Sequence, residues 1–170
     1  MIREPNMPFR AVLTRAGVRA ALAAFDNGST VAIAAVAAGD AAYSPMLDGD
    51  GRATQSRLRA ERERGAARDG GETDGGAVRV RFLLDGSASF WVRELGFFLT
   101  DGTLFAVWCA PRRTLAWKHA ETPLLLDFDI SLGDMPRRSV TVESGRLPSA
   151  ELLDFLAIAL GGAPEVDDHG

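Results

Sequence analysis

The sequence predicts an α+β fold, a mainly antiparallel β-rich domain with one N-terminal helix and one apolar C-terminal helix. Three observations lead to this prediction. Residues 78–82 and 126–131 alternate apolar with polar or charged residues, at the two-residue period of a half-exposed strand. Asp101-Gly102 separates two runs rich in aromatic and aliphatic residues, which favours a tight hairpin turn. Residues 15–25 place apolar side chains at helical spacing.

Composition limits the class of protein further. The chain has 170 residues, of which 46% are hydrophobic, and this suits one domain with its own core. The net charge is −4 and the pI is about 5.2, so there is no overall basic field to hold nucleic acid or an anionic membrane. We expect no targeting segment and no membrane span, because no apolar run reaches the required length of about 18 residues. The single Cys109 rules out an internal disulfide, favours a buried strand thiol and fits assembly in a reducing cytoplasm.

The first predicted element is a helix over residues 15–25. Thr14 is a suitable N-cap, and Val18, Leu22 and Phe25 recur on one face, which we expect to be buried. Gly28 suits the left-handed position that ends a helix.

A strand is predicted next, over residues 30–38, although this alanine-rich run is also compatible with a helix. Residues 39–51 should form a loop, and the glycine-rich, acidic stretch 69–76 should form a mobile one. The alternating segments 78–82 and 126–131 then join strands predicted at 90–99 and 103–109, with a type I′ turn between the last two.

Few residues suggest chemistry. Asp127 and Asp129 share one strand face and could bind Ca²⁺ or exchange protons, but a solvent-facing role is the simpler interpretation. Asp48 to Gly51 lacks the remaining ligands of a calcium loop and is predicted to be a turn. His119 and His169 have no partner at zinc-ligand spacing. The sequence contains no nucleophile elbow, phosphate loop or dinucleotide fingerprint, so we expect no enzyme, no cofactor and no metal site.

Arginines gather between residues 52 and 68, where nucleic-acid binding has to be weighed against a solvated face or a protein contact. Glu61 and Glu63 interrupt this run and no aromatic residue is interleaved, so we favour the second interpretation.

Arg93 and Glu94 are neighbours on a predicted strand and therefore point to opposite faces. If Glu94 points inward, it needs hydrogen bonds or a cation, for which an arginine of the 57–68 region is a candidate. The nearby large aromatic residues are expected to be mostly core, with some facing another subunit. They are Trp91, Phe97, Phe98, Phe105 and Trp108.

The run from Phe90 to Val107, FWVRELGFFLTDGTLFAV, closely resembles the signature of the phage tail-collar fibre protein family, in the domain that attaches tail fibres to the virion. Looser similarity extends the resemblance to residues 9–143, with the glycine-rich stretch after residue 68 departing from the family pattern. The signature residues, which we treat as interface or structural residues, are Trp91, Arg93, Glu94, Gly96, Asp101 and Gly102.

The resemblance implies a structural tail protein, a short tail fibre or baseplate adaptor that attaches a host-recognition fibre to the virion tail. It also implies assembly in the bacterial host cytoplasm, contacts with other tail or baseplate proteins or with a separate fibre chain, and a homotrimer. An assembly factor or a small ligand-binding domain remains the alternative.

The sequence divides into a tail-collar fibre-like domain over residues 1–146 and a C-terminal part over 147–170. In the second part a helix capped by Ser149 is predicted before Gly161, followed by a disordered acidic tail. The helix would be apolar over much of its surface, so it should pack on its own domain or contact another chain. Its candidate contact residues are Leu152, Leu153, Phe155, Leu156, Ile158 and Leu160.

Overall fold

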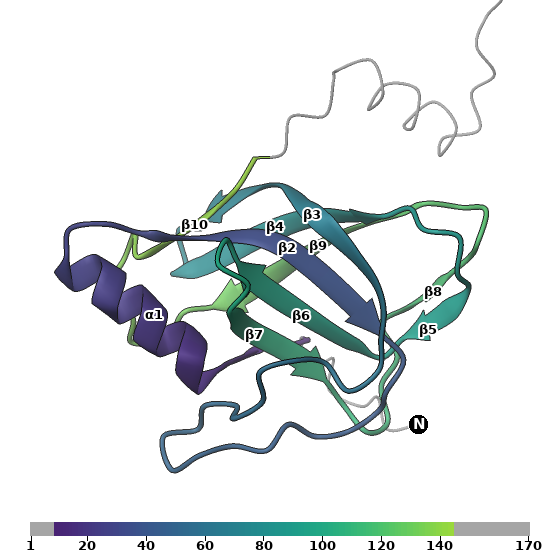
Figure 1. The fold of residues 1–170 in the computed structure, drawn as a ribbon, viewed down its shortest axis with the longest axis horizontal. Coiled ribbons are helices and arrows are strands. Elements are labelled where there is room, and N and C mark those ends of the chain that lie inside the picture. The colour runs from purple at the N-terminus through teal and green to yellow at the C-terminus, as the bar shows by residue number, and fades with distance from the viewer. Residues whose placement is uncertain (1–8, 145–170) are drawn as a thin grey trace, which may run out of the picture.

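The computed structural model describes residues 9–144, which form a curved β-sheet with a single helix packed beside it (Figure 1). The elements in chain order are β1 (Val12–Leu13), α1 (Arg15–Asp26), β2 (Val31–Gly39), β3 (Glu61–Glu72), β4 (Ala77–Leu84), β5 (Phe90–Val92), β6 (Glu94–Leu99), β7 (Leu104–Cys109), β8 (Ala116–Lys118), β9 (Leu124–Ser131) and β10 (Val140–Val142). The predicted α+β class with one N-terminal helix is confirmed. The predicted apolar C-terminal helix, and the boundary at residue 147, lie outside the described residues.

The main sheet has the strand order β1-β7-β6-β2-β3-β4-β9, and every neighbouring pair along this path is antiparallel. The sheet curls around its own core, so that side chains from distant strands meet inside. The ring of Phe97 on β6 lies 5.3 Å from that of Phe128 on β9, and 6.3 Å from that of Phe82 on β4, measured between centroids. This enclosed aromatic cluster holds the two halves of the sheet together.

Helix α1 begins where predicted and ends one residue later than predicted, at Asp26, but it buries a different face. The Thr14 hydroxyl accepts a hydrogen bond from the Gly17 amide at 2.9 Å and donates to the carbonyl of Leu104, so the N-cap also ties the helix to β7. The buried helix residues are Gly17 and Ala21. A Cβ atom at position 17 would lie only 2.6 Å from the Cα of Phe105. The helix therefore lies too close to β7 for a large side chain on this face.

The predicted apolar face of α1 is consequently wrong in part. Val18 is half-buried against the core, whereas Leu22 and Phe25 remain 39% and 43% exposed. Helical spacing shows which residues share a face of the helix but not which face meets the sheet. Here the small residues Gly17 and Ala21 make the contact.

The alanine-rich run forms β2, the central strand, so the strand interpretation is confirmed over the helix. Ala37 and Ala38 are fully buried between the strands that pair on either side. The charged segment after residue 60 forms the long strand β3, which sequence reasoning did not predict because its side chains follow no apolar period.

The prediction of a mobile loop over residues 69–76 is wrong for its first half. Residues 69–72 complete β3 and pair with β4, and only residues 73–76 form the connecting turn. Backbone pairing with β4 supplies the order here, since glycines offer few side-chain contacts.

The hairpin at Asp101-Gly102 is confirmed, but the predicted type I′ turn is wrong. Gly102 has φ +89°, whereas Arg138 is the only non-glycine with positive φ among residues 9–144, so Asp101 does not have one. The Gly102 amide donates to the Leu99 carbonyl, and the Leu99 amide to the Thr103 carbonyl, both at 2.9 Å. This is a three-residue loop that closes on a left-handed glycine, a common alternative to type I′.

The last strand departs from the antiparallel pattern. The strand β10 pairs in parallel with β2, matching Val140 with Val31 and Val142 with Ile33. The chain therefore leaves the described domain running in the same direction as β2.

Asp127 and Asp129 occupy the solvent face of the sheet, as predicted, and each meets an arginine of β4. Arg81 holds Asp127 through two hydrogen bonds of 2.8 and 3.0 Å, and Arg79 holds Asp129 in the same way. These hydrogen bonds lower the pKa of both carboxyl groups below the ordinary value.

Replacing Asp127 by asparagine should therefore have a small, pH-dependent effect. A lowered pKa in the folded state stabilises the fold above the ordinary aspartate pKa, and this contribution disappears as the pH falls through the lowered value. The side chains of both partners are 44–47% exposed, so solvent screening limits the loss to at most about 1 kcal/mol at pH 7. Urea unfolding of both proteins at several pH values checks this, and a difference that persists at pH 2 would contradict it.

Candidate functional site

The predicted strand over residues 90–99 is broken at Arg93, and the break separates two structural roles. The following residues continue as β6 in the main sheet, whereas β5 turns away and pairs with β8 in a separate two-stranded sheet. The Arg93 amide donates to the carbonyl of Gly39 at 2.9 Å, which fixes this small sheet at the end of β2. In Figure 1 the small sheet stands at the right-hand edge of the domain, away from α1.

The small sheet presents two tryptophans to solvent. Trp91 lies directly opposite Trp117 across the strand pair, with ring centroids 4.9 Å apart. The two residues are 47% and 44% exposed, so the expectation that Trp91 belongs to the core is wrong, and its other assigned role, at an interface, stays open. The inner faces of the same strands are buried, with Val92 fully inaccessible. We call the exposed rings of Trp91 and Trp117 the tryptophan pair.

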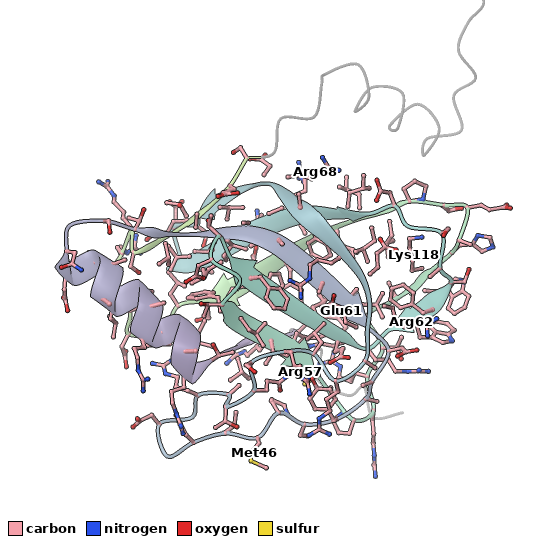
Figure 2. The ribbon with its side chains drawn as sticks, in the orientation of Figure 1. Met46, Arg57, Glu61, Arg62, Arg68 and Lys118 are labelled. Atoms are coloured by element: carbon pink, nitrogen blue, oxygen red, sulfur yellow. The ribbon has the colours of Figure 1, made fainter. Side chains whose placement is uncertain are left out.

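Two arginines, Arg62 and Arg93, lie close to β5. The guanidinium of Arg62 lies 5.9 Å from the ring of Phe90 on β5, and 3.8 Å from the carboxylate of Asp40. The Arg93 guanidinium donates a long hydrogen bond of 3.5 Å to the carbonyl of Asp40. Figure 2 shows Arg62 at the same edge of the domain as Lys118 of β8. On β5 the Phe90 side chain is buried and that of Trp91 is exposed, so the contact of Arg62 with Phe90 lies on the opposite face of the strand from the tryptophan pair.

Behind this surface, Glu94 is fully buried and accepts hydrogen bonds from three donors. The Tyr43 hydroxyl donates at 2.6 Å, the Ala60 amide at 2.7 Å and the Arg59 amide at 3.1 Å. The prediction that the 57–68 region supplies the partner is confirmed in location, but backbone amides take the place of a guanidinium. Burial and the neighbouring Glu94 carboxylate raise the pKa of Tyr43 well above its usual value, so the phenol stays a donor.

Tyr43 links this carboxylate to the loop around it. Its hydroxyl accepts a hydrogen bond from the Gln55 side chain at 2.8 Å, and the Arg59 guanidinium stacks 4.0 Å from its ring centroid. The carboxylate thus fastens the irregular segment between β2 and β3 to the start of β6.

A second buried charge, Lys118, holds the small sheet to the main one, and sequence reasoning missed it. Its ammonium is fully buried and donates to the carbonyls of Gly86 and His119 at 2.7 and 2.6 Å. It lies 4.0 Å from a carboxylate oxygen of Glu63 on β3, and neither oxygen of that carboxylate accepts a hydrogen bond within the described residues. The available signal was that Lys118 is the only lysine in a chain that otherwise uses arginine.

The signature residues separate into two groups in space. Trp91 lies on β5, and Arg93 and Glu94 follow it at the start of β6. Asp101 and Gly102 instead form the turn at the other end of β6. Gly96 lies between them and packs closely, since an added Cβ would lie 2.9–3.1 Å from the side chains of Phe98, Leu58 and Leu104. Of the first group, Trp91 belongs to the exposed aromatic surface, and Glu94 is buried behind it.

Other exposed apolar residues lie on α1 and the loop after β2. Leu22 and Phe25 protrude from the helix, and Met46 and Leu47 from the loop, with Met46 71% exposed. The hollow beside α1 is lined by residues of both charge signs, including Arg15 and Asp48, which form an ion pair of 2.9 Å. This surface is less aromatic than the tryptophan pair and nearly balanced in charge.

The residues considered above as catalytic or metal-ligating candidates do not come together in one site within the described residues. Asp48 accepts hydrogen bonds from the amides of Asp50 and Arg52, as a turn residue does. Cys109 is half-buried at the end of β7, and burial raises its pKa to about 11, which keeps it a thiol. Within residues 9–144 the structure gathers no group of three or more His, Cys, Asp or Glu side chains able to hold a metal ion.

No helix of the described part of the chain is long and apolar enough to cross a membrane.

Comparison with known proteins agrees with the resemblance seen in the signature. The family model described as phage tail-collar fibre protein, N-terminal, matches residues 6–116, which include α1, the strands from β1 to β7 and only the first residue, Ala116, of β8. No curated protein and no solved structure matches the chain. Because the family model covers more than half of the sequence, this chain belongs to the phage tail-collar fibre protein family, whose members are structural components of phage tails.

Proposed function

We propose that this protein is an adaptor of the virion tail, a short tail fibre or baseplate component that joins a host-recognition fibre to the tail. The tryptophan pair is the observation that carries the proposal. Half-exposed aromatic rings that contact each other across a strand pair are typical of the residues that dominate protein interfaces, and arginine is enriched there as well. The domain would dock on another tail or baseplate protein through this surface.

The rigidity of the surface supports a docking role. The tryptophan pair lies on two strands that Lys118 and Glu63 connect to the main sheet, and Glu94 fixes the chain immediately after β5. A surface whose strands are already held in place loses little conformational entropy when a partner binds. We also propose that the protein assembles as a homotrimer, as the family resemblance implies, and that the fibre continues in a separate chain.

The combined variant Trp91→Ala/Trp117→Ala should fold but fail to enter particles. Both side chains are half-exposed, so truncating them costs little stability, whereas hot-spot truncations weaken binding by about 2 kcal/mol or more each. The measurement is quantitative mass spectrometry of purified particles, with the ratio to a known tail protein determined. In wild-type particles that ratio should be fixed and a multiple of three.

The matched control is Leu22→Ala/Phe25→Ala, which removes a similarly exposed apolar pair from α1 and should leave incorporation unchanged. Normal incorporation of the tryptophan variant would contradict the docking surface. Absence of the wild-type chain from mature particles would overturn the virion role and favour an assembly factor or a small ligand-binding domain.

A further inference from the structure

We infer that the loop between β2 and β3, residues 40–60, binds an extended acidic segment of a partner protein through the guanidinium groups of Arg57 and Arg59. The loop runs along the lower edge of the domain in Figure 1, whereas the tryptophan pair lies on the small sheet at the right-hand edge. This second surface is independent of the tryptophan pair, and the inference therefore stands without the proposed function. Together the two surfaces would let one adaptor hold two partners.

The loop is long but fixed at several points. A connection of more than about 12–15 residues without secondary structure of its own is uncommon in a compact domain and is usually functional. Here the Ala53 amide donates to the carbonyl of Leu13, and the Ala53 carbonyl accepts from the Arg15 amide, both at 2.9 Å. Leu58 is buried in a core cluster with Phe98 of β6. The loop therefore presents its exposed side chains from a backbone that is already in place.

The arginines between residues 52 and 68 divide into two kinds in the structure. Arg64 is held by the carboxylate of Glu61 at 2.7 Å. Arg57 and Arg59 are exposed and form no ion pair within the described part of the chain. Because a guanidinium group stays charged at physiological pH, these two side chains present cations that the described domain leaves unpaired.

The two unpaired arginines line a hollow of about 650 Å³ on the loop. No acidic side chain lies among the residues that line it, and its other polar side chains are those of Thr54, Gln55 and Ser56. The guanidinium of Arg59 lies 4.0 Å from the ring centroid of Tyr43. Since a ring face offers no carbonyl or carboxylate oxygen, the N–H donors of this guanidinium stay available. The hollow therefore offers hydrogen-bond donors and positive charge to an anion.

The chemistry of the hollow favours carboxylates of a protein over a nucleic acid. A guanidinium group pairs with a carboxylate through two parallel hydrogen bonds. A nucleic acid needs a longer cationic track and exposed rings on which bases can stack. Tyr43 is instead buried beneath Arg59, and the net charge of the chain is −4.

An exposed apolar side chain lies next to the hollow. The Met46 carbonyl accepts a hydrogen bond from the Thr54 amide at 3.0 Å, and the Met46 side chain is largely exposed. Figure 2 shows Met46 and Arg57 on this loop, in the lower part of the view. A partner segment that carries an apolar residue beside its carboxylates would cover both kinds of side chain.

The test is a fluorescence anisotropy titration of a fluorescein-labelled peptide of alternating glutamate and glycine with the full-length protein at low ionic strength. We expect saturable binding, and none of the same peptide with glutamine in place of glutamate. Binding should weaken as salt is added, because exposed charges are screened. Absence of binding by the glutamate peptide, or equal binding of the glutamine peptide, would overturn the inference.

Substitutions locate the contact. Arg57→Gln/Arg59→Gln should weaken binding roughly tenfold, which is about threefold for each exposed charge pair. Arg57→Gln alone should weaken it about threefold while the contact of Arg59 with Tyr43 is kept, so that a disturbed loop cannot explain the result. The control Arg10→Gln/Arg19→Gln removes two exposed arginines outside the loop and should leave binding unchanged. Equal affinity of the loop variant and the control would overturn the assignment.

Competition separates the classes of partner. A single-stranded oligonucleotide of the same charge that binds more tightly than the peptide, and no longer binds Arg57→Gln/Arg59→Gln, would overturn the inference in favour of a nucleic acid. Displacement of the peptide by an equal concentration of inorganic phosphate would indicate a general anion site and would overturn it too.

The two proposals fail separately. Absence of peptide binding together with failed incorporation of Trp91→Ala/Trp117→Ala would overturn the loop contact alone. Peptide binding that depends on Arg57 and Arg59, together with normal incorporation of the tryptophan variant, would overturn the docking surface alone.

Discussion

Replacing Glu94 by alanine is expected to lower the free energy of unfolding by about 4 kcal/mol, because one buried and two partly buried donors lose their acceptor and each unsatisfied donor costs about 1–3 kcal/mol. The donors are the Tyr43 hydroxyl and the amides of Arg59 and Ala60. For a chain of this size the loss corresponds to a melting temperature roughly 8–16 °C lower. Calorimetry and urea unfolding measure both quantities.

A local readout tests the cause of that loss. Amide hydrogen exchange at Arg59 and Ala60 should accelerate in Glu94→Ala, because the two amides no longer bond to the carboxylate. Glu94→Gln should fall between wild type and alanine, since it keeps the shape but turns an NH₂ group toward a donor. The control Glu61→Ala, at an exposed position, should change stability by less than about 0.5 kcal/mol. A loss below about 1 kcal/mol for Glu94→Ala would mean that water replaces the carboxylate at this site.

Replacing Lys118 by methionine is expected to destabilise the protein by about 3–5 kcal/mol, the cost of leaving a buried carboxylate without its cation. The Glu63 carboxylate accepts no hydrogen bond within the described residues, and the carbonyls of Gly86 and His119 would lose their donor. The small sheet should loosen first, which exchange at residues 90–92 and 116–118 would report.

A double-mutant cycle distinguishes the ion pair from simple loss of packing. Glu63→Leu/Lys118→Met removes both charges and should be more stable than Lys118→Met alone, because apolar pairs often replace buried ion pairs without loss. Arg57→Met, an exposed charge removal, is the control and should change stability by less than about 0.5 kcal/mol. Strictly additive effects of the two single substitutions would show that Glu63 and Lys118 do not interact.

The buried charges of Glu94 and Lys118 also show what the sequence could not predict. The adjacent positions of Arg93 and Glu94 predicted opposite faces, and the need for a partner near residues 57–68 followed from the cost of a buried carboxylate. The identity of the donors did not follow, because backbone amides carry no sequence signal. The role of Lys118 was even less predictable from the sequence, since the residues that surround it come from β3 and from the loops after β4 and β8.

The turns and strands show the same limit. Alternation predicted β4 and β9 because each has one face in water, and Asp101-Gly102 marked a hairpin. The turn type, the pairing of residues 69–72 and the parallel β10 depended on neighbouring strands that the local sequence does not specify.

The sequence by itself determined the α+β class, the capped helix, the signature hairpin and the family, because capping, alternation and turn chemistry depend on residues close in the chain. Only the tertiary structure decided that Gly17 and Ala21, and not Leu22 and Phe25, face the sheet, and that Trp91 meets Trp117 in solvent. The physical reason is that burial depends on how closely distant segments approach, and that distance is set by the packing of the whole domain.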